Sequence, residues 1–452
     1  MNYDVTVVGG GIVGLATAHR LLAAQPQLKI LLLEKEAKLA AHQTGNNSGV
    51  LHSGLYYQPG SEKAKCAVQG LQQMLAFCRA HGIAHEQCGK IVVATEAAEL
   101  PRLENLWERG QANGLQGLRK LTPAQIKEIE PHAAGLAAIH VPQEGIVDYP
   151  AVCEKLGELI RQAGGEIKLN TRVEKMHPAA GGWTVETSAG DFPTKFVVTC
   201  GGLHADRLVR AAGQTPLAKI VPFRGEYFQI KKERRQLVRH LIYPVPDPKF
   251  PFLGVHFTRL VHGGIEAGPN AVLAFAREGY QWTDVNLRDL AESLFYPGLW
   301  KFLVKYPSMC GYEIRRSLSK AEFTRSLQKL VPEIRAEDLE TGGAGVRAQA
   351  MLPAGRLIED FHFEEARGAL HVINAPSPAA TAALAIGAKI SEIVLTRLEL
   401  SGENGSMKFS LSPARPQPPA RGQISEAPRI ARRRLCLRPK SQFQNQIIDQ
   451  CF

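Results

Sequence analysis

The chain has 452 residues, of which 44% are hydrophobic and 21% are charged. This composition excludes a disordered or fibrous chain, and the length predicts two domains rather than one compact core. The formal net charge of +11 is concentrated at one end, because residues 405–452 hold nine Lys or Arg and only two acids. The rest of the chain is therefore close to neutral.

The sequence gives no sign of export. It has no stretch of about 18 apolar residues that would predict a membrane-spanning helix, and it enters an apolar strand at Asp4–Val5 without a basic leader. The eight cysteines are scattered and form no CxxC pair, which disfavours a zinc site or a disulfide framework. We therefore expect reduced thiols, no metal and a cytoplasmic protein.

The first 34 residues follow the order strand, glycine turn, helix, strand, acid. An apolar run leads into Gly9-Gly10-Gly11-Ile12-Val13-Gly14, and a second apolar run ends at Glu34. In such a unit Gly9 permits a tight turn, Gly11 lets the backbone approach a pyrophosphate, and Gly14 lets helix and strand pack closely. The helix N-terminus favours the pyrophosphate, and the acid accepts hydrogen bonds from a ribose diol. The motif predicts a dinucleotide site but leaves FAD and NAD open.

Alternating strands and helices continue to about residue 400. A predicted helix over 151–163 and apolar strands at 166–169, 196–200 and 370–374 continue the nucleotide domain, and an Ala-rich helix is expected over 379–400. The stretches 91–150 and 220–335 differ, with longer strands and loops rich in Pro and Gly. They predict a second domain that is inserted twice into the first.

Six further segments are distinctive in sequence. They lie at 42–54 (HQTGNNSGVLHSG), 222–227 (PFRGEY), 243–258, 268–275 (GPNAVLAF), 344–350 (AGVRAQA) and 374–381 (NAPSPAAT). Together with the glycine motif, they resemble the FAD-dependent L-2-hydroxyglutarate dehydrogenase/oxidase family, a branch of the D-amino-acid-oxidase-like flavoproteins. The chain departs from that pattern at Asn46, where the family most often has His, and in a tail from 401 that has no counterpart.

The resemblance implies an α/β fold in which a Rossmann-type FAD-binding domain carries an inserted substrate domain with a mixed or antiparallel sheet. The expected division is 1–90, 151–215 and 336–400 for the FAD-binding domain, 91–150 and 216–335 for the substrate domain, and 401–452 for a basic, disordered tail.

The implied reaction is oxidation of L-2-hydroxyglutarate to 2-oxoglutarate, with the C2 hydride passing to flavin N5 and electrons passing on to a quinone pool or to oxygen. A related flavoprotein acting on glycerol 3-phosphate, malate or an amino acid is the alternative among enzymes. A flavin-fold protein without turnover is the alternative from a different class. No nucleic-acid partner is expected.

Oxidising a 2-hydroxy acid requires a base for the hydroxyl proton, and action near neutral pH favours histidine. His256 is the first candidate, because it follows an apolar run in a strand expected to face the flavin. His52 is the second, in a small-residue loop that should lie over the flavin ring. A structural histidine is the alternative for each.

A dicarboxylate substrate also requires cations, and the planar fork of Arg suits a carboxylate best. Arg347, in Ala-Gly-Val-Arg, resembles the substrate-binding arginine of related oxidases, and Arg224, in Pro-Phe-Arg-Gly, is the second candidate. Arg277 is a weaker third, for which a surface salt bridge is the favoured interpretation.

The resemblance places the cofactor on the glycine turn, on the loop after the second strand, and on two later segments. The helix expected after Asn374 would place its N-terminal dipole near the flavin. The predicted cofactor residues are Gly9, Gly11, Gly14, Glu34, Thr44, Asn47, Ser48, Gly49, Gly201, Asn374, Pro376 and Ser377.

One apolar segment, 294–303, has basic residues at its end in Lys301 and Lys305. Such a segment is typical of a helix that docks on a membrane surface, where a quinone dissolves, although a buried helix is the alternative. It raises the hypothesis of a peripheral contact on the inner face of the cell membrane.

Overall fold

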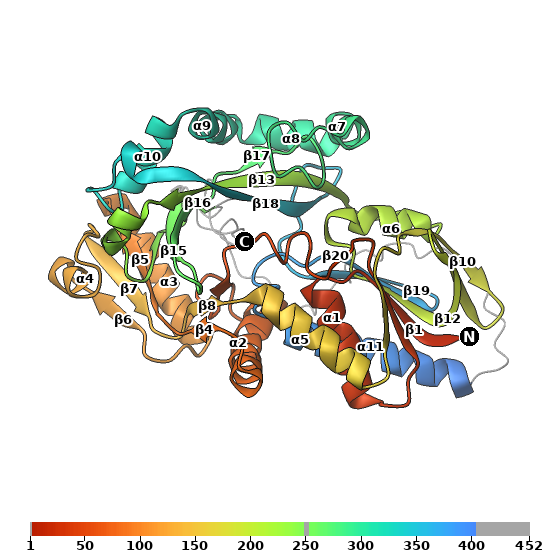
Figure 1. Ribbon diagram of the computed structural model, residues 1–452. Helices are drawn as coiled ribbons and strands as arrows, with labels where there is room; N and C mark the ends of the chain where they lie inside the picture. The colour runs from red at the N-terminus through yellow and green to blue at the C-terminus, as the bar shows by residue number, and fades with distance from the viewer. Residues whose placement is uncertain (1, 248–252, 404–452) are drawn as a thin grey trace, which may run out of the picture.

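The computed structural model describes residues 2–247 and 253–403 (Figure 1). Part of the predicted segment 243–258 and nearly all of the predicted tail lie outside these residues. Two large sheets form the body of the molecule, and a small third sheet lies between them. The α/β fold predicted from the sequence is confirmed.

The first large sheet is parallel at its centre, in the order β20-β12-β1-β2-β9. Antiparallel strands β10 and β11 extend it beyond β12, and β19 pairs with β20. Its strands are β1 (Tyr3–Val8), β2 (Ile30–Leu33), β9 (Glu166–Lys168), β10 (Val173–Ala179), β11 (Gly182–Thr187), β12 (Gly190–Thr199), β19 (His362–Ala366) and β20 (Ala369–Asn374).

Strand β2 shows why the nucleotide strands are continuous apolar runs. Ile30 and Leu32 pack into the core beneath the helices, whereas Leu31 and Leu33 pack into a separate core on the opposite face. Both faces of the parallel sheet are therefore buried, as the crossover helices require. The helices of this domain are α1 (Ile12–Ala24), α2 (Glu62–His81), α5 (Tyr149–Gln162), α6 (Ala205–Ala211) and α11 (Ala383–Glu403).

Helix α11 begins later than the sequence predicts. Residues 377–382 form turns, and the helix begins at Ala383. The Ala379 N–H donates to the Pro376 carbonyl and the Ala382 N–H to the Pro378 carbonyl, both at 2.9 Å, so the chain turns before the helix begins.

The second large sheet runs in the order β17-β13-β16-β15-β14-β5-β7-β6, and β18 pairs with β13. Its neighbours are antiparallel except β14 and β5. The strands are β5 (Lys90–Ala94), β6 (Arg119–Leu121), β7 (Ala137–Val141), β13 (Lys219–Ile230), β14 (Leu241–Pro244), β15 (His256–Arg259), β16 (Ile265–Gly268), β17 (Val272–Leu273) and β18 (Leu339–Met351).

Helices cover the outer side of this second sheet (Figure 1). Leu299, Phe302 and Met309 pack on Val221 and Phe223 of β13. The helices of this domain are α3 (Leu100–Ala112), α4 (Pro123–Ile129), α7 (Leu287–Leu294), α8 (Pro297–Lys305), α9 (Pro307–Leu318) and α10 (Lys320–Gln328). Short 3-10 helices lie at Ala97–Glu99, Gly202–His204, Lys232–Leu237 and Ala336–Asp338.

The structure places β18 differently from the predicted domain division. The sequence assigned 336–400 to the nucleotide domain, but β18 pairs with β13 from Leu339 to Met351 and so belongs to the second sheet. Periodicity could not show this, because a strand's partner is set by contacts far away in the sequence.

The small sheet consists of β3 (Val50–Leu51), β8 (Gly145–Val147) and β4 (His85–Glu86). It brings the loop after Glu34 next to the inserted domain. Within the described ranges, no helix has both the length and the apolar composition needed to cross a bilayer.

Candidate active site

A cavity of about 1170 Å³ runs from the glycine turn of the first sheet to β13 and β18 of the second. Its size exceeds the range of about 300–1,000 Å³ that is common for drug-sized ligands. Gly9, Gly11 and Glu34 line one part of it, and His52 and Arg347 line another. One cavity thus joins the predicted nucleotide site to two of the predicted catalytic residues.

The glycine turn leaves no room for side chains. Gly9 has φ +117°, and a Cβ on it would lie 2.4 Å from the Cys200 carbonyl oxygen. A Cβ on Gly14 would lie 2.1 Å from the Gly9 carbonyl oxygen. Helix α1 begins at Ile12, and its N-cap, Gly11, provides no side-chain cap. Gly11, Ile12 and Val13 at the start of α1 line the cavity, and a helix N-terminus favours the pyrophosphate of a dinucleotide.

The Glu34 carboxylate fixes the turn as well as lining the cavity. Its Oε2 accepts a hydrogen bond from the Gly10 N–H at 2.7 Å, and its Oε1 accepts one from the Glu36 N–H at 2.9 Å. An ionised carboxylate has about four acceptor sites, so a ribose diol can be bound in addition to these two donors.

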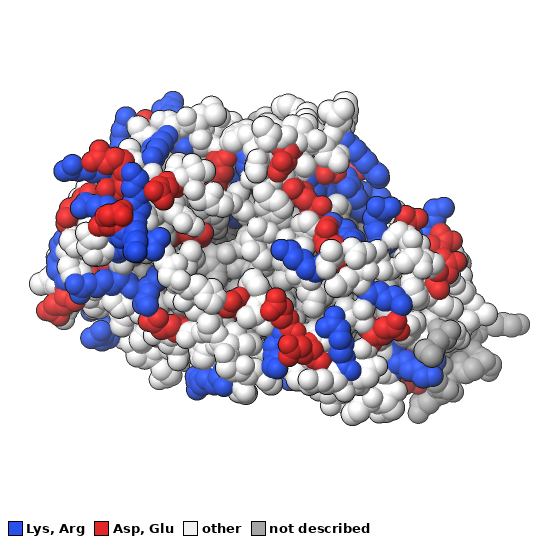
Figure 2. All heavy atoms as spheres, viewed as in Figure 1, with Lys and Arg blue, Asp and Glu red and all other residues white. Residues whose placement is uncertain are grey.

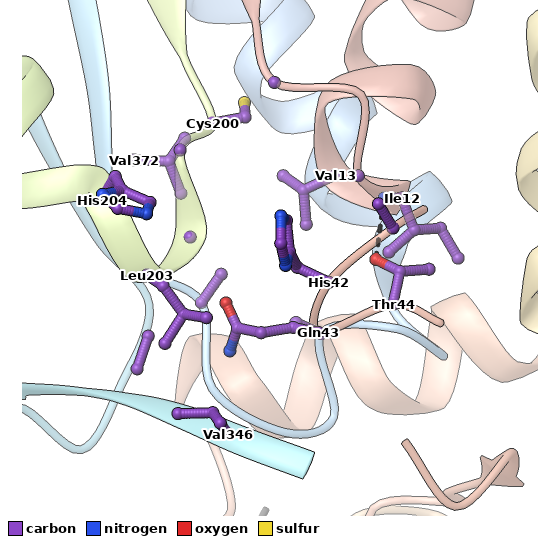
Figure 3. Close-up of a pocket in the computed structure, with 18 of the residues that line it drawn as sticks. Ile12, Val13, His42, Gln43, Thr44, Cys200, Leu203, His204, Val346 and Val372 are labelled. Carbon is purple, nitrogen blue, oxygen red and sulfur yellow. Dashed lines mark hydrogen bonds between the residues drawn. The ribbon is translucent and has the colours of Figure 1, made fainter. Parts of the chain in front are cut away.

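The loop after β2 closes over the start of helix α1. Thr44 Oγ1 accepts a hydrogen bond from the Ile12 N–H at 3.2 Å (Figure 3). The Asn46 amide donates to the His42 carbonyl at 2.8 Å and to the Ala41 carbonyl at 3.2 Å. The residue at position 46, where this chain departs from the family pattern, therefore anchors its own loop.

An ion-pair cluster links the two domains across the cavity. Glu278 follows the second-domain strand β17 and lies 2.7 Å from Lys35 Nζ, 3.2 Å from His42 Nε2 and 2.9 Å from His204 Nε2. Burial opposes ionisation, but His204 and Lys35 outweigh it and lower the pKa of Glu278 to about 2. His42 and His204 both project into the cavity in Figure 3.

Within residues 2–247 and 253–403, one group of side chains is close enough to hold a metal ion: Glu36, His42 and Glu278. The Lys35 ammonium contacts both carboxylates. These acids therefore already have a cationic partner in the protein.

Nine of the twelve predicted cofactor residues line the cavity: Gly9, Gly11, Glu34, Thr44, Asn47, Ser48, Gly201, Pro376 and Ser377. Gly14, in the first turn of helix α1, and Gly49, just before β3, are not among the lining residues. Asn374 is turned away, because its amide donates to the carbonyls of Ile358 at 2.8 Å and Asp360 at 2.9 Å.

The structure places His52 in the cavity wall at the end of β3. Its backbone N–H donates to Thr381 Oγ1 at 3.1 Å, and its ring Nδ1 lies 3.7 Å from Glu144 Oε2. Burial lowers the pKa of His52, although Glu144 opposes this effect. The imidazole is therefore neutral near neutral pH, which is the form that can accept a proton.

His256 lies deeper, at the start of β15, and is not among the cavity-lining residues. Its side chain is fully buried, its ring stacks on Tyr243 at 3.9 Å, and Nδ1 lies 3.0 Å from the Gly254 carbonyl oxygen. Burial is the main cause that lowers the pKa of His256 to about 3. Of the two predicted bases, only His52 reaches the cavity.

The three candidate arginines occupy different environments. Arg347 lines the cavity, and its Nη1 donates to the Asn270 carbonyl at 3.1 Å. Arg224 is 1% exposed, lies over the Trp282 ring at 4.3 Å and pairs with Glu226 at 3.0 Å, outside the cavity lining.

The sequence favoured a surface salt bridge for Arg277. The structure shows a salt bridge, but it is buried. Arg277 Nη2 pairs with Asp206 at 3.0 Å and with Glu292 at 3.1 Å, and the guanidinium is 1% exposed.

Sequence reasoning missed several polar residues behind and beside His52. Tyr149 OH lies 2.8 Å from Thr381 Oγ1 and donates to the Val50 carbonyl at 2.9 Å. Lys90 and Glu144 are both fully buried, and they form an ion pair next to His52. No local motif marks these residues, because each comes from a different element. A lysine opening the apolar strand at 90–94 was the one available signal.

The fold and the cavity together define a flavoprotein oxidoreductase. The family described as FAD dependent oxidoreductase matches residues 4–393. The fold is similar to that of FAD-bound L-α-glycerophosphate oxidase from Mycoplasma pneumoniae, with a TM-score of 0.70 and 22% identity over 88% of this chain and 95% of that one. Glycine oxidase from Geobacillus kaustophilus gives a TM-score of 0.66 at 19% identity, with 88% and 95% covered.

The sequence relatives are more specific. L-2-hydroxyglutarate dehydrogenase of Indibacter alkaliphilus is 51% identical over 88% of this chain and 100% of its own length. The Escherichia coli K12 enzyme of the same name is 44% identical, over 89% and 96%, and the mitochondrial enzyme of Homo sapiens is 44% identical, over 88% and 90%. The chain belongs to the L-2-hydroxyglutarate dehydrogenase family. The predicted family and the FAD cofactor are thereby confirmed.

Proposed function

We propose that this enzyme oxidises L-2-hydroxyglutarate to 2-oxoglutarate. The observation that carries the proposal is that His52 and Arg347, a base and a carboxylate-binding cation, line the same cavity as the glycine turn. The names of the sequence relatives support the choice of substrate.

Bound FAD supplies the two-electron acceptor for the C2 hydride, at flavin N5. His52 takes the proton of the C2 hydroxyl, because a neutral imidazole near a reacting hydroxyl is an effective general base. Arg347 binds a substrate carboxylate through its planar fork and so fixes the orientation of C2 and of the one hydrogen that C2 carries.

The test is reduction of the bound flavin without oxygen, followed by its absorption band. We expect L-2-hydroxyglutarate to bleach the band rapidly, and its D-enantiomer, L-malate and glycerol 3-phosphate to leave it unchanged. Bleaching by one of the other compounds alone would overturn the substrate and keep the flavoprotein. Comparison of a quinone analogue with oxygen as reoxidant then identifies the acceptor.

We propose further that the enzyme passes its electrons on at a membrane surface. The observation is a group of strongly exposed apolar side chains on and just before α7, α8 and α9, which we call the α7–α9 surface: Leu287, Phe295, Trp300, Val304, Ile314 and Leu318. Helices α7–α9 lie at the top of the view in Figure 1, and in the same view Figure 2 shows few charges along this edge. Exposed Lys301, Lys305 and Arg315 flank it. Aromatic and aliphatic side chains with a basic rim are typical of interfacial contacts with anionic lipid.

Co-sedimentation with vesicles containing phosphatidylglycerol tests this contact. We expect the wild-type enzyme to bind these vesicles, and the double variant Phe295→Ser/Val304→Ser to lose most of the binding while it keeps flavin reduction. Equal sedimentation of the wild type and the double variant would contradict the proposed membrane contact. Dimerisation of the wild type in place of vesicle binding would contradict it as well.

A further inference from the structure

Lys90 and Glu144 form an ion pair that is fully buried, beside the cavity but outside its lining. Lys90 opens β5, and Glu144 lies in the turn between β7 and β8. Removing two charges from water costs several kcal/mol per ion, so a buried pair contributes little to stability. The presence of this pair calls for another explanation.

The Glu144 carboxylate is held from several sides. Its Oε1 accepts hydrogen bonds from the Ser53 backbone N–H at 3.2 Å and from the Ser53 hydroxyl at 2.8 Å. Its Oε2 contacts Lys90 Nζ and lies 3.7 Å from His52 Nδ1. The Lys90 ammonium is itself held over the rings of Tyr56 at 4.5 Å and Tyr243 at 4.7 Å. Of the residues around this carboxylate, His52 is the one that lines the cavity.

The charges in this cluster leave Glu144 ionised. Burial alone would raise its pKa, but Lys90 and His52 lower the pKa of Glu144 to about 2. Lys90 in turn lowers the pKa of His52, and Glu144 raises it. Burial lowers the pKa of His256, and Lys90, Arg347 and His52 lower it further. Burial lowers the pKa of Lys90, and Glu144 opposes this effect. The cluster therefore pairs an ionised Glu144 with Lys90 beside a neutral His52.

An ionised carboxylate only accepts hydrogen bonds. Nδ1 is the His52 nitrogen that faces this anion, at 3.7 Å from Oε2. The negative charge of the carboxylate favours a proton on Nδ1 of the neutral ring, which leaves Nε2 as the acceptor. A buried carboxylate that fixes the tautomer of a catalytic histidine and stabilises its protonated form is a recurrent arrangement in enzymes.

We propose that Glu144, held by Lys90 and Ser53, is the positioning residue for His52 and keeps its Nε2 ready to accept the substrate proton. When Nε2 takes that proton, the ring becomes a cation beside the Glu144 anion. This inference rests on the proposed function for the identity of the substrate, but the tautomer of His52 does not depend on the substrate.

The experiment compares FAD-loaded wild type, Glu144→Gln, Glu144→Asp and the double variant Lys90→Met/Glu144→Gln, in which no buried charge is left unpaired. We expect Glu144→Gln to lower the plateau rate of flavin reduction about ten- to a hundredfold and to move the acid limb of its pH profile to lower pH, because the anion raises the pKa of His52. Glu144→Asp should recover part of the rate. The double variant should recover FAD binding and thermal stability but not the rate.

A second readout needs no substrate. Spectra of ¹⁵N-histidine in the FAD-loaded protein, assigned by the signal lost in His52→Gln, should show the Nδ1–H tautomer in wild type and a mixture in the Glu144→Gln and double variants. If L-2-hydroxyglutarate does not reduce the wild-type flavin, the proposed function fails and this readout still decides the inference.

Glu130→Gln is the matched control. Glu130 is also fully buried and lies 3.0 Å from a histidine ring nitrogen, that of His240, but neither residue lines the cavity. This variant should lose thermal stability and keep the reduction rate and its pH profile. A wild-type tautomer and profile in Glu144→Gln would overturn the inference. A double variant with the wild-type rate would also overturn it, because the carboxylate would then matter only as the partner of Lys90.

Discussion

The two ends of the cavity are built in different ways. At the turn end, one continuous stretch of 34 residues supplies Gly9, Gly11, the start of α1 and Glu34. At the reactive end, His52 comes from the end of β3 and Arg347 from β18 of the other large sheet. The turn end depends on the absence of side-chain volume, whereas the reactive end depends on the charge and tautomer of a few side chains. Changes of volume and changes of charge should therefore have different effects at the two ends.

The largest effect is expected from added volume at the turn. The Cβ of Gly14→Ala would lie 2.1 Å from the Gly9 carbonyl oxygen, so the turn and α1 must separate. We expect the affinity for FAD to fall more than about a hundredfold, which corresponds to about 2.7 kcal/mol. The FAD content of the purified protein and titration of the apoprotein measure it. Gly311→Ala, on α9 with no atom within 4 Å of the new Cβ, should keep FAD, and retention of FAD by both variants would contradict the steric account.

The next largest effect is expected from removing the base at the reactive end. His52→Gln should lower the rate of flavin reduction at least about a hundredfold, because the proton acceptor at the cavity wall is lost. His256→Asn should lower it less, since His256 lies behind the lining. Stopped-flow reduction of FAD-loaded variants tests the pair, and the opposite order of effects would restore His256 as the base.

The same contrast explains what the sequence could predict. The glycine turn and Glu34 could be assigned because they belong to one strand–turn–helix–strand unit whose local spacing determines the geometry, whereas Thr44 was reached through a resemblance. Arg347 and His52 were reached through a resemblance, and their convergence depends on the pairing of β18 with β13 and on the small sheet between the domains.

Lys90 and Glu144 could not be predicted. They are 54 residues apart, and only the β5–β7 pairing and the turn before β8 bring them together. The ranking of His256 over His52 rested on a strand expected to face the flavin, and burial behind Tyr243 is a property of packing that periodicity does not reveal.

A smaller effect is expected from changing the shape of a cation without changing its charge. Arg347→Lys loses the planar fork and the hydrogen bond to the Asn270 carbonyl. We expect kcat/KM to fall about ten- to a hundredfold, or about 1.5–3 kcal/mol of transition-state binding. Arg224→Lys, which is buried against Trp282, should lower the unfolding temperature and change kcat/KM less than about threefold. Equal losses of kcat/KM would place both arginines on the substrate.

The smallest effect is on stability and follows from burial at the reactive end. The pKa of His256 is lowered from 6.5 to about 3 by burial, so between these values the unfolded chain binds a proton that the folded protein does not. The contribution of His256 to stability is therefore complete above pH 6.5 and is lost as the pH falls from 6.5 towards 3. His256→Asn should make the unfolding temperature depend less on pH in this window, by a few degrees, whereas the exposed control His177→Asn should follow the wild type. Thermal unfolding at a series of pH values measures the difference. If the unfolding temperatures of all three proteins fell in parallel with pH, His256 would be protonated in the folded state in this window, and burial would not lower its pKa.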